Sequence, residues 1–199
     1  MVITMFNMNR LFDCEVILAS QSPRRKELLS LIFDSFRIKP AQSDEVIDKN
    51  TPTDLVPQSL ALDKCKEIAK SEPHALVIGC DTAVILGDLI MGKPEDDDDE
   101  YSMLSQLSGK THKVISGVAV YYNGEYTQFS SVTEVTFKSL TEQDIWDYIA
   151  TGEPSDKAGA YGIQGKGSVL VESINGDYFN VVGLPVSDLA TTLKKLAYK

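Results

Sequence analysis

The sequence predicts a mixed α/β fold, built on a twisted sheet with flanking helices. Short apolar runs alternate with amphipathic stretches along the chain, which is typical of strands that alternate with helices. Turn signals at Asn123-Gly124 and Gly87-Asp88 add hairpins to this pattern. Of the 199 residues, 43% are hydrophobic and 24% are charged, as in ordinary globular domains.

The first third of the chain reads as a strand followed by a helix, twice over. The apolar run 15–20 predicts a buried strand, and a helix follows, with Ser22 as its N-cap and Pro23 in its first turn. The residues before this strand are expected to be a loose extension, which we place at 1–14, ahead of a single domain of two lobes at 15–199. The same patterns predict a strand over 36–38, a helix over 57–70 and a strand over 75–79.

Hairpins dominate the middle of the chain. Gly87-Asp88 lies between the apolar runs of 83–91, and Asn123-Gly124 joins two long alternating strands at 113–122 and 125–137. The acidic run 95–100 is expected to begin a helix, because carboxylates in a first turn complement the helix dipole, and Gly109 is expected to end that helix.

The last third combines two helices with a glycine-rich segment. Thr141 is expected to cap a helix that Gly152 ends, and another helix is expected after Ser187. Between these helices the sequence predicts a glycine-rich loop over 159–167, a strand over 168–173, a turn at 175–176 and a strand over 178–182.

Charge and cysteine content exclude several classes of protein. Nineteen Lys and Arg residues against 29 Asp and Glu residues give a net charge of −10, which disfavours binding to a nucleic-acid backbone. No apolar run approaches the roughly 18 residues of a membrane helix. Three widely spaced cysteines fit neither a disulfide framework nor a zinc site, so we expect a cytoplasmic protein.

A strand-to-helix junction at 20–25 is the first candidate for chemistry. Backbone N–H groups at a helix N-terminus attract anions, and Arg24 and Arg25 add two cations where cations ordinarily destabilise a helix. A local rule broken in this way suggests a bound anion such as phosphate. The alternative is a basic helix start exposed to solvent.

Two further segments carry polar groups beside apolar strands. Asp81 and Thr82 are expected at the carboxyl end of the strand 75–79, where α/β enzymes commonly place a base or metal ligand, and Lys93 could return to that end. In the loop 159–167, the glycines allow the backbone to approach a ligand, and the Gln164 amide could read a base edge. An ordinary turn and a flexible surface loop are the alternatives.

Taken together, these segments resemble the Maf family of nucleoside-triphosphate pyrophosphatases. The resemblance runs from about Val16 to Leu196, and only the N-terminal extension lies outside it. The matching segments, in order, are SQSPRR at 20–25, SDE at 43–45, GCDT at 79–82, GKP at 92–94, LSGKTHKV at 107–114, DKAGAYGIQG at 156–165 and NVVGLP at 180–185.

The resemblance implies an α/β fold of two lobes around a central cleft, similar to that of the inosine-triphosphate pyrophosphatases. It also implies hydrolysis of a nucleoside triphosphate to the monophosphate and pyrophosphate, which removes unwanted nucleotides from the pool. The stretch KAGAYGIQG is similar to the dTTP/UTP branch. The alternatives are a pyrophosphatase for purine or modified nucleotides, and a regulatory nucleotide-binding module linked to septum formation.

Residue roles follow from the resemblance position by position. Asp81 matches the family's proposed general base, and Glu45 with Asp81 could bind Mg²⁺ or Mn²⁺ through hard oxygen ligands. Sequence alone leaves open whether Asp81 is base, metal ligand or both. A homodimer is expected from the family. The residues expected to bind substrate are Ser20, Arg24, Arg25, Lys64, Thr82, Lys93 and Gln164.

Overall fold

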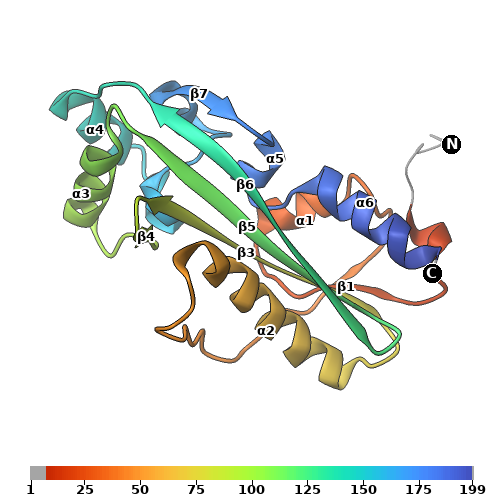
Figure 1. Cartoon of the computed structure of the whole chain (residues 1–199). Coiled ribbons are helices and arrows are strands. Elements are labelled where there is room, and N and C mark those ends of the chain that lie inside the picture. The colour runs from red at the N-terminus through yellow and green to blue at the C-terminus, as the bar shows by residue number, and fades with distance from the viewer. Residues whose placement is uncertain (1–7, 199) are drawn as a thin grey trace, which may run out of the picture. The chain divides into compact units, whose positions relative to one another are not determined.

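A computed structural model describes residues 8–198 (Figure 1). It confirms the mixed α/β class with a seven-stranded sheet, whose strand order is β2-β1-β3-β5-β6-β7, with β4 paired to β3. Strand β1 is parallel to β2 and β3, whereas β3 with β4 and β6 with β7 are antiparallel. The strands are β1 (Val16–Leu18), β2 (Arg37–Ile38), β3 (Leu76–Leu86), β4 (Leu89–Met91), β5 (Thr111–Tyr122), β6 (Glu125–Phe137) and β7 (Val171–Asn175).

Six α-helices and several short 3₁₀ segments complete the described part of the chain. Among residues 8–198, no helix combines the length and the apolar character needed to cross a membrane. The helices are α1 (Pro23–Leu29), α2 (Val56–Ser71), α3 (Asp97–Leu107), α4 (Glu142–Ile149), α5 (Tyr178–Val182) and α6 (Val186–Ala197).

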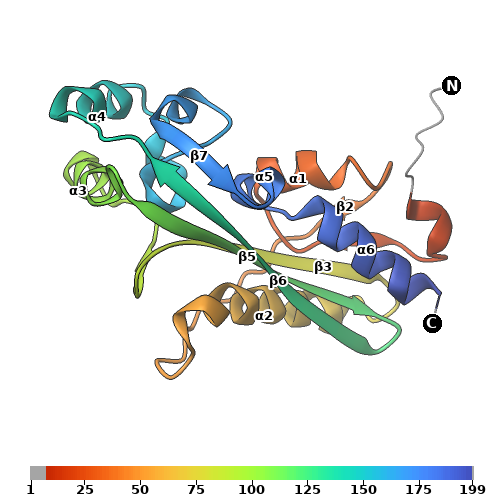
Figure 2. The same ribbon diagram turned by 45° about the horizontal axis from the view of Figure 1, so that its top comes forward.

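The chain divides into two compact units. The first unit comprises residues 8–81, 116–131 and 183–198, and the second comprises residues 82–115 and 132–182. In the first unit, α2 covers one face of the strands, and α1 and α6 lie on the other face (Figures 1 and 2). Ala61, Cys65 and Ile68 of α2 pack in this core against Ile17 and Val77.

The second unit has a separate apolar core. Helices α3 and α4 lie side by side there, and the rings of Tyr101 and Trp146 stack with centroids 5.0 Å apart (Figure 1). Leu104, Phe137 and Ile145 are buried in the same cluster. Each unit therefore has an apolar core of its own.

Local signals set most of the element boundaries. Ser22 caps α1, and Thr141 caps α4 in a full capping box with Asp144, both as predicted. Asn123 and Gly124 have φ values of 49° and 87°, which are the left-handed values that a two-residue hairpin turn requires. The acidic run does begin α3, with Asp96 as its N-cap.

Three sequence predictions are wrong, and one of them concerns the N-terminal segment. Residues 1–7 lie outside the described residues, but residues 8–11 form a 3₁₀ helix that is part of the first unit. Met8 and Phe12 are buried, and the rings of Phe12 and Tyr122 pack nearly perpendicular to each other with their centroids 5.1 Å apart. This part of the predicted loose extension is held by apolar burial.

The second wrong prediction concerns the strand expected at 178–182, which is helix α5. The Asp177 side chain accepts a hydrogen bond from the Phe179 backbone N–H, which favours a helical turn. Buried Asn180 donates to the carbonyl of Val114 and to the Thr133 hydroxyl. These tertiary contacts override the strand preference of Tyr, Phe and Val. The neighbouring strand, expected over 168–173, begins at Val171 because residues 166–170 form a 3₁₀ segment, and it continues to Asn175, which was expected in a turn.

The third wrong prediction concerns Asp81, which was expected at the end of a strand. Strand β3 continues through Asp81 to Leu86, and the hairpin turn at Gly87 follows. Residues after Asp81 remain in the ladder because β4 pairs with them, Val84 opposite Met91. Asp81 therefore lies within a long strand and not beside a tight turn.

Candidate active site

The first-unit candidates gather where the parallel strands β1 and β3 lie side by side. Leu18 pairs with Ile78, and the Ala19 N–H donates to the Ile78 carbonyl at 2.8 Å. Continuing this register along β3 brings Ser20, which is buried, alongside the residues next to Asp81. The parallel pairing of β1 with β3 thus brings Ser20 toward the part of β3 that carries Asp81, which is 61 positions later in the sequence.

Lys64 of α2 joins the two predicted metal-binding carboxylates. Its Nζ lies 2.5 Å from Asp81 Oδ1 and 2.7 Å from Glu45 Oε1. The Lys64 and Asp81 side chains are 17% and 15% exposed, whereas the Glu45 side chain is 54% exposed. The Lys64–Asp81 pair is consequently shielded from solvent, and Glu45 approaches it from a loop on the surface.

Close backbone packing holds α2, and with it Lys64, against the sheet. A Cβ on Gly79 would collide with the Ala61 carbonyl and would lie 2.9 Å from the Cys65 Cβ. A Cβ on Gly117 would collide with the backbone of Gln58. Only glycine allows α2 to lie this close to β3 and β5, so these two positions set the distance between Lys64 and Asp81.

Arg25 is part of the scaffold at the junction between β1 and α1. Its Nε donates to the Gly183 carbonyl at 3.1 Å, and its Nη1 donates to the Ser20 Oγ at 3.2 Å. The Cys80 thiol donates to the same Gly183 carbonyl at 3.3 Å. Arg24 is half-buried in the first turn of α1, a turn that contains no acidic residue. The two arginines therefore have different surroundings.

In the second unit, Thr82 lies within β3, and Lys93 follows β4, the strand that pairs with β3. The last pair of that register is Val84 with Met91, so Lys93 lies two residues beyond the paired part of the hairpin. The intervening Gly92 carbonyl accepts a hydrogen bond from the Gly159 N–H at 3.0 Å. This bond attaches the start of the glycine-rich loop to the same hairpin.

Gln164 is exposed and lies within the segment 162–167, which we call the Gln164 loop. The Tyr161 ring precedes this loop and is buried, with its hydroxyl 2.8 Å from His112 Nε2. Burial in an apolar environment lowers the pKa of His112 to about 4. The histidine is therefore a neutral core residue at neutral pH.

Two residues that sequence reasoning did not single out hold the Gln164 loop. The Glu153 carboxylate accepts hydrogen bonds from the backbone N–H groups of Lys166 and Gly167. The Tyr148 hydroxyl donates to the same carboxylate and accepts from the Gly162 N–H. The unusual spacing of glycines after Glu153 was the available signal, but it does not identify the side chain that those glycines approach.

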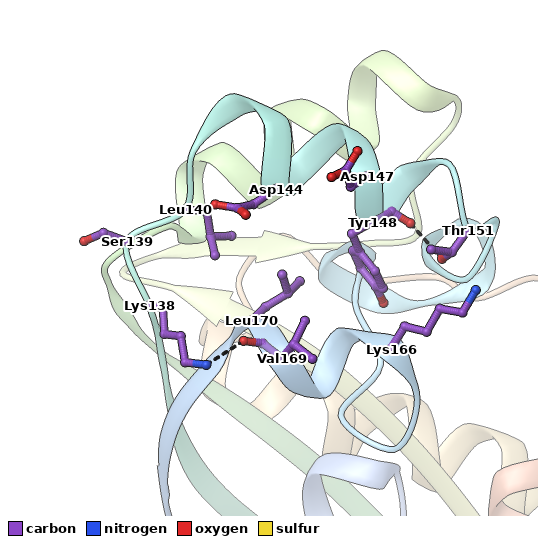
Figure 3. Close-up of a pocket in the computed structure, with 10 residues that line it drawn as sticks. All are labelled: Lys138, Ser139, Leu140, Asp144, Asp147, Tyr148, Thr151, Lys166, Val169 and Leu170. Carbon is purple, nitrogen blue, oxygen red and sulfur yellow. Dashed lines mark hydrogen bonds between the residues drawn. The ribbon is translucent and has the colours of Figure 1, made fainter.

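A cavity of about 440 Å³ lies beside Tyr148, between α4 and the 3₁₀ segment 166–170 (Figure 3). Tyr148 projects from α4 toward Lys166 and Val169 (Figure 3). The Lys138 ammonium donates a hydrogen bond to the Val169 carbonyl at 2.9 Å. No predicted site residue lines this cavity. The structure therefore does not connect it with the predicted chemistry.

The donor set at Lys64 is compatible with a hard divalent cation. Lys64 contacts one oxygen of each carboxylate, so Glu45 and Asp81 converge and each has a second oxygen. Mg²⁺ commonly takes only one or two protein carboxylates, and substrate phosphates and water fill its other positions. Within residues 8–198, no cluster of three His, Cys, Asp or Glu side chains offers a fuller protein-only cage.

Comparison with known proteins covers almost the whole chain. Residues 15–196 match the family model described as Maf-like protein. A dTTP/UTP pyrophosphatase of Geobacillus sp. (strain WCH70) is 47% identical over 184 residues, which are 92% of this chain and 99% of that relative. A dTTP/UTP pyrophosphatase of Bacillus pumilus (strain SAFR-032) is 49% identical over 181 residues, which are 90% of this chain and 95% of the relative.

Solved structures with little sequence similarity have the same fold. The Staphylococcus aureus Ham1 protein gives a TM-score of 0.55 at 13% identity, and the Coxiella burnetii HAM1 protein gives 0.55 at 15% identity. Each comparison covers 92% of this chain and 99% of the other chain. At this level of identity the similarity concerns the fold alone.

Proposed function

Because this chain belongs to the Maf family, we propose that it hydrolyses dTTP and UTP to the nucleoside monophosphate and pyrophosphate. The observation that carries this proposal is the identity of 47% and 49% to two dTTP/UTP pyrophosphatases over at least 90% of the chain. The resemblance in the sequence led to the same reaction. A module that only binds nucleotides is not favoured, because it would not need Asp81, Glu45 and Lys93 together.

In this proposal Asp81 acts on the attacking water. The carboxylate accepts a proton from water as the water oxygen bonds to the α-phosphorus, and the bond to the α–β bridging oxygen breaks. Pyrophosphate leaves with the electron pair of that bond. Lys64, which lies 2.5 Å from Asp81, keeps the carboxylate oriented and adds positive charge beside it.

Cations must offset the charge of the substrate. A triphosphate brings about four negative charges to a protein whose net charge is −10, so local positive charge has to attract it. We assign this role to Arg24, Arg25, Lys64 and Lys93, together with Mg²⁺ or Mn²⁺ held by Glu45 and Asp81. The metal ion, when bound, would neutralise phosphate charge as the pyrophosphate departs.

The remaining assignments follow from the Maf pattern. Ser20 and Thr82 provide hydroxyl groups for substrate oxygens, and Gln164 contacts the nucleobase through its amide. We further propose that the protein works in the cytoplasm on free nucleotides, and that it forms a homodimer. Its acidic charge argues against a nucleic-acid polymer as substrate.

A nucleotide panel tests the proposal. Purified protein is incubated with dTTP, UTP, dCTP, dATP, dGTP and 7-methyl-GTP in the presence of Mg²⁺ or Mn²⁺, and pyrophosphate and nucleoside monophosphate are quantified. We expect both products in equal amounts, with dTTP and UTP preferred. Release of inorganic phosphate with a diphosphate product would contradict the reaction. Tight binding without hydrolysis would instead support the regulatory module.

A further inference from the structure

We propose that Glu153 is a positioning residue for Gln164, and that it determines nucleobase selectivity by fixing the Gln164 loop. This inference rests on the proposed function, because it takes Gln164 as the residue that contacts the base. Glu153 itself touches backbone and Tyr148, so it acts through the loop and not on the substrate.

The Glu153 carboxylate binds the end of the loop at two points. Its Oε2 accepts from the Lys166 N–H at 2.7 Å, and its Oε1 accepts from the Gly167 N–H at 3.1 Å. Burial raises the pKa of this carboxyl, but the two N–H groups and the Tyr148 hydroxyl outweigh burial and hold the pKa below its ordinary value. The carboxylate is therefore ionised at neutral pH and accepts charge-assisted hydrogen bonds.

Tyr148 extends the same contact to the start of the loop. Its hydroxyl donates to Glu153 Oε1 at 3.0 Å and accepts from the Gly162 N–H at 3.0 Å. The ring is buried, and Figure 3 shows it projecting from α4 toward the segment that carries Lys166. Gly162 and Lys166 lie two residues before and two residues after Gln164. One carboxylate and one hydroxyl thus hold both sides of that residue.

The contacts that Glu153 and Tyr148 make with the Gln164 loop explain why this loop contains glycines at 162, 165 and 167. A Cβ on Gly165 would collide with the Glu153 carboxylate, and a Cβ on Gly167 would lie 2.6 Å from the Tyr148 hydroxyl. A Cβ on Gly162 would lie 2.7 Å from Lys157 Cε, and the Lys157 ammonium donates to the Glu153 carbonyl at 2.5 Å. The sequence suggested that these glycines allow close approach to a ligand, whereas here they allow close approach to protein side chains.

Selectivity depends on this restraint because an amide reads a base edge only at a defined position. Recognition groups must be held within about 0.5 Å of their productive position. Gln164 is exposed, so nothing in its own burial provides that restraint. A loop released at 166–167 would have to be ordered again on each binding event, and a misplaced amide would no longer discriminate between bases.

The first test compares nucleotide selectivity in matched variants. The ratio of kcat/KM for dTTP to kcat/KM for dGTP is measured for the wild type, Glu153→Ala, Glu153→Gln and Gln164→Ala. Glu172→Gln, an exposed site on β7 of the same unit, is the control. We expect Glu153→Ala to lower the ratio roughly tenfold to a hundredfold, mainly through KM for dTTP. Glu153→Gln keeps one acceptor oxygen, so its ratio should lie between those of the wild type and Glu153→Ala. The Glu172→Gln control should keep the wild-type ratio.

The second test measures how well ordered the Gln164 loop is, without relying on catalytic activity. Amide hydrogen exchange of residues 162–167 is measured in the same variants, with the amides of β5 and β6 as the internal reference. We expect exchange in this loop to accelerate at least about tenfold in Glu153→Ala while the reference strands keep their protection. Equal acceleration throughout the protein would show general destabilisation and would overturn the positioning role.

The outcomes separate this inference from the proposed function. A wild-type ratio in Glu153→Ala, together with a lowered ratio in Gln164→Ala, would overturn the role of Glu153 and leave Gln164 in place. Wild-type ratios in both variants would overturn base reading by this loop. Failure of the wild type to release pyrophosphate from any nucleotide would overturn the proposed function, and this inference with it, before any variant is compared.

Discussion

The Lys64 cluster of the first unit and the Gln164 loop of the second unit are held in place in opposite ways. Lys64, Asp81 and Glu45 are charged side chains that contact one another directly, at 2.5 and 2.7 Å. The Gln164 loop is held by its backbone, through N–H groups that donate to Glu153 and Tyr148. In the first region the functional groups fix one another. In the second region, residues with no proposed contact to substrate fix the functional group.

This difference matches what each region is proposed to do. Proton transfer and charge neutralisation need ionised side chains near one another, because their effect depends on charge at short range. Base recognition needs a neutral amide at a fixed position, which the backbone can provide. Substitutions in the first region should therefore change turnover or its dependence on the metal ion, and substitutions around the second should change selectivity or local order.

The largest effect is expected from Asp81→Asn. This change keeps the shape of the side chain and removes the base, so kcat should fall at least about a hundredfold. Pyrophosphate release is measured at saturating dTTP, and Asp63→Asn, an exposed site on α2, is the control. Near-normal turnover in Asp81→Asn would remove this residue from the mechanism.

The next effect concerns the buried His112, whose pKa lies near 4 in the folded protein and at 6.5 as its ordinary value. Between pH 6.5 and pH 4 the His112 imidazole is protonated in the unfolded chain but neutral in the folded protein. The stability that comes from this difference is therefore fully present above pH 6.5 and is lost as the pH falls toward 4. Between pH 7.5 and 4.5 the free energy of unfolding should fall by about 2 to 3 kcal/mol through this residue. This loss of stability would weaken the packing of His112 against Tyr161, the residue that precedes the Gln164 loop.

Urea unfolding at the two pH values checks this expectation. His112→Gln can still bond the Tyr161 hydroxyl but does not titrate, so its stability should depend less on pH than that of the wild type. His74→Gln changes an exposed histidine and should keep the wild-type dependence. Equal pH dependence in all three proteins would show that His112 is not the titrating group.

A smaller effect is expected from Arg24→Gln. If Arg24 meets phosphate, kcat/KM should fall roughly tenfold while the unfolding free energy changes little, because cations at a helix N-terminus do not stabilise it. Arg25→Gln is the comparison, since it removes bonds to Ser20 and Gly183 and should also lower stability. Unchanged kcat/KM in Arg24→Gln would rule out its proposed contact with phosphate.

The smallest effect is expected from Glu45→Gln. Glu45 is the exposed member of the Lys64 cluster, and exposed charge interactions contribute about 1 kcal/mol or less. The Mg²⁺ concentration for half-maximal activity should rise by up to about fivefold, with kcat at saturating metal nearly unchanged. Identical metal titrations for the variant and the wild type would exclude Glu45 as a ligand.

Signals within a few residues of one another predicted most of the fold. The caps at Ser22 and Thr141 and the turn at Asn123-Gly124 depend on local backbone chemistry, and the structure has all three. The strand expected at 178–182 was wrong because the contacts of Asn180 with Val114 and Thr133 lie far away in the sequence. Periodicity over five residues does not report such contacts.

The candidate site divides in the same way. Asp81, Lys64 and Glu45 are ionisable residues in segments that match a family pattern, so the sequence points to them directly. Glu153 is one acidic residue among many, and its importance depends on a loop that returns to it 13 or 14 residues later. Only the structure shows that the glycines at 165 and 167 face Glu153 and Tyr148.

Gly79 and Gly117 have a consequence for how variants of this protein should be interpreted. These two residues contribute no functional group, yet their lack of a side chain lets α2 lie close to β3, which carries Asp81, and to the neighbouring strand β5. A methyl group added at either position would push Lys64 away from its partner while leaving every residue of the proposed mechanism in the sequence. A screen that scores only loss of protein would record such a variant as a folding defect, although the same shift of α2 would also change the position of Lys64 relative to Asp81.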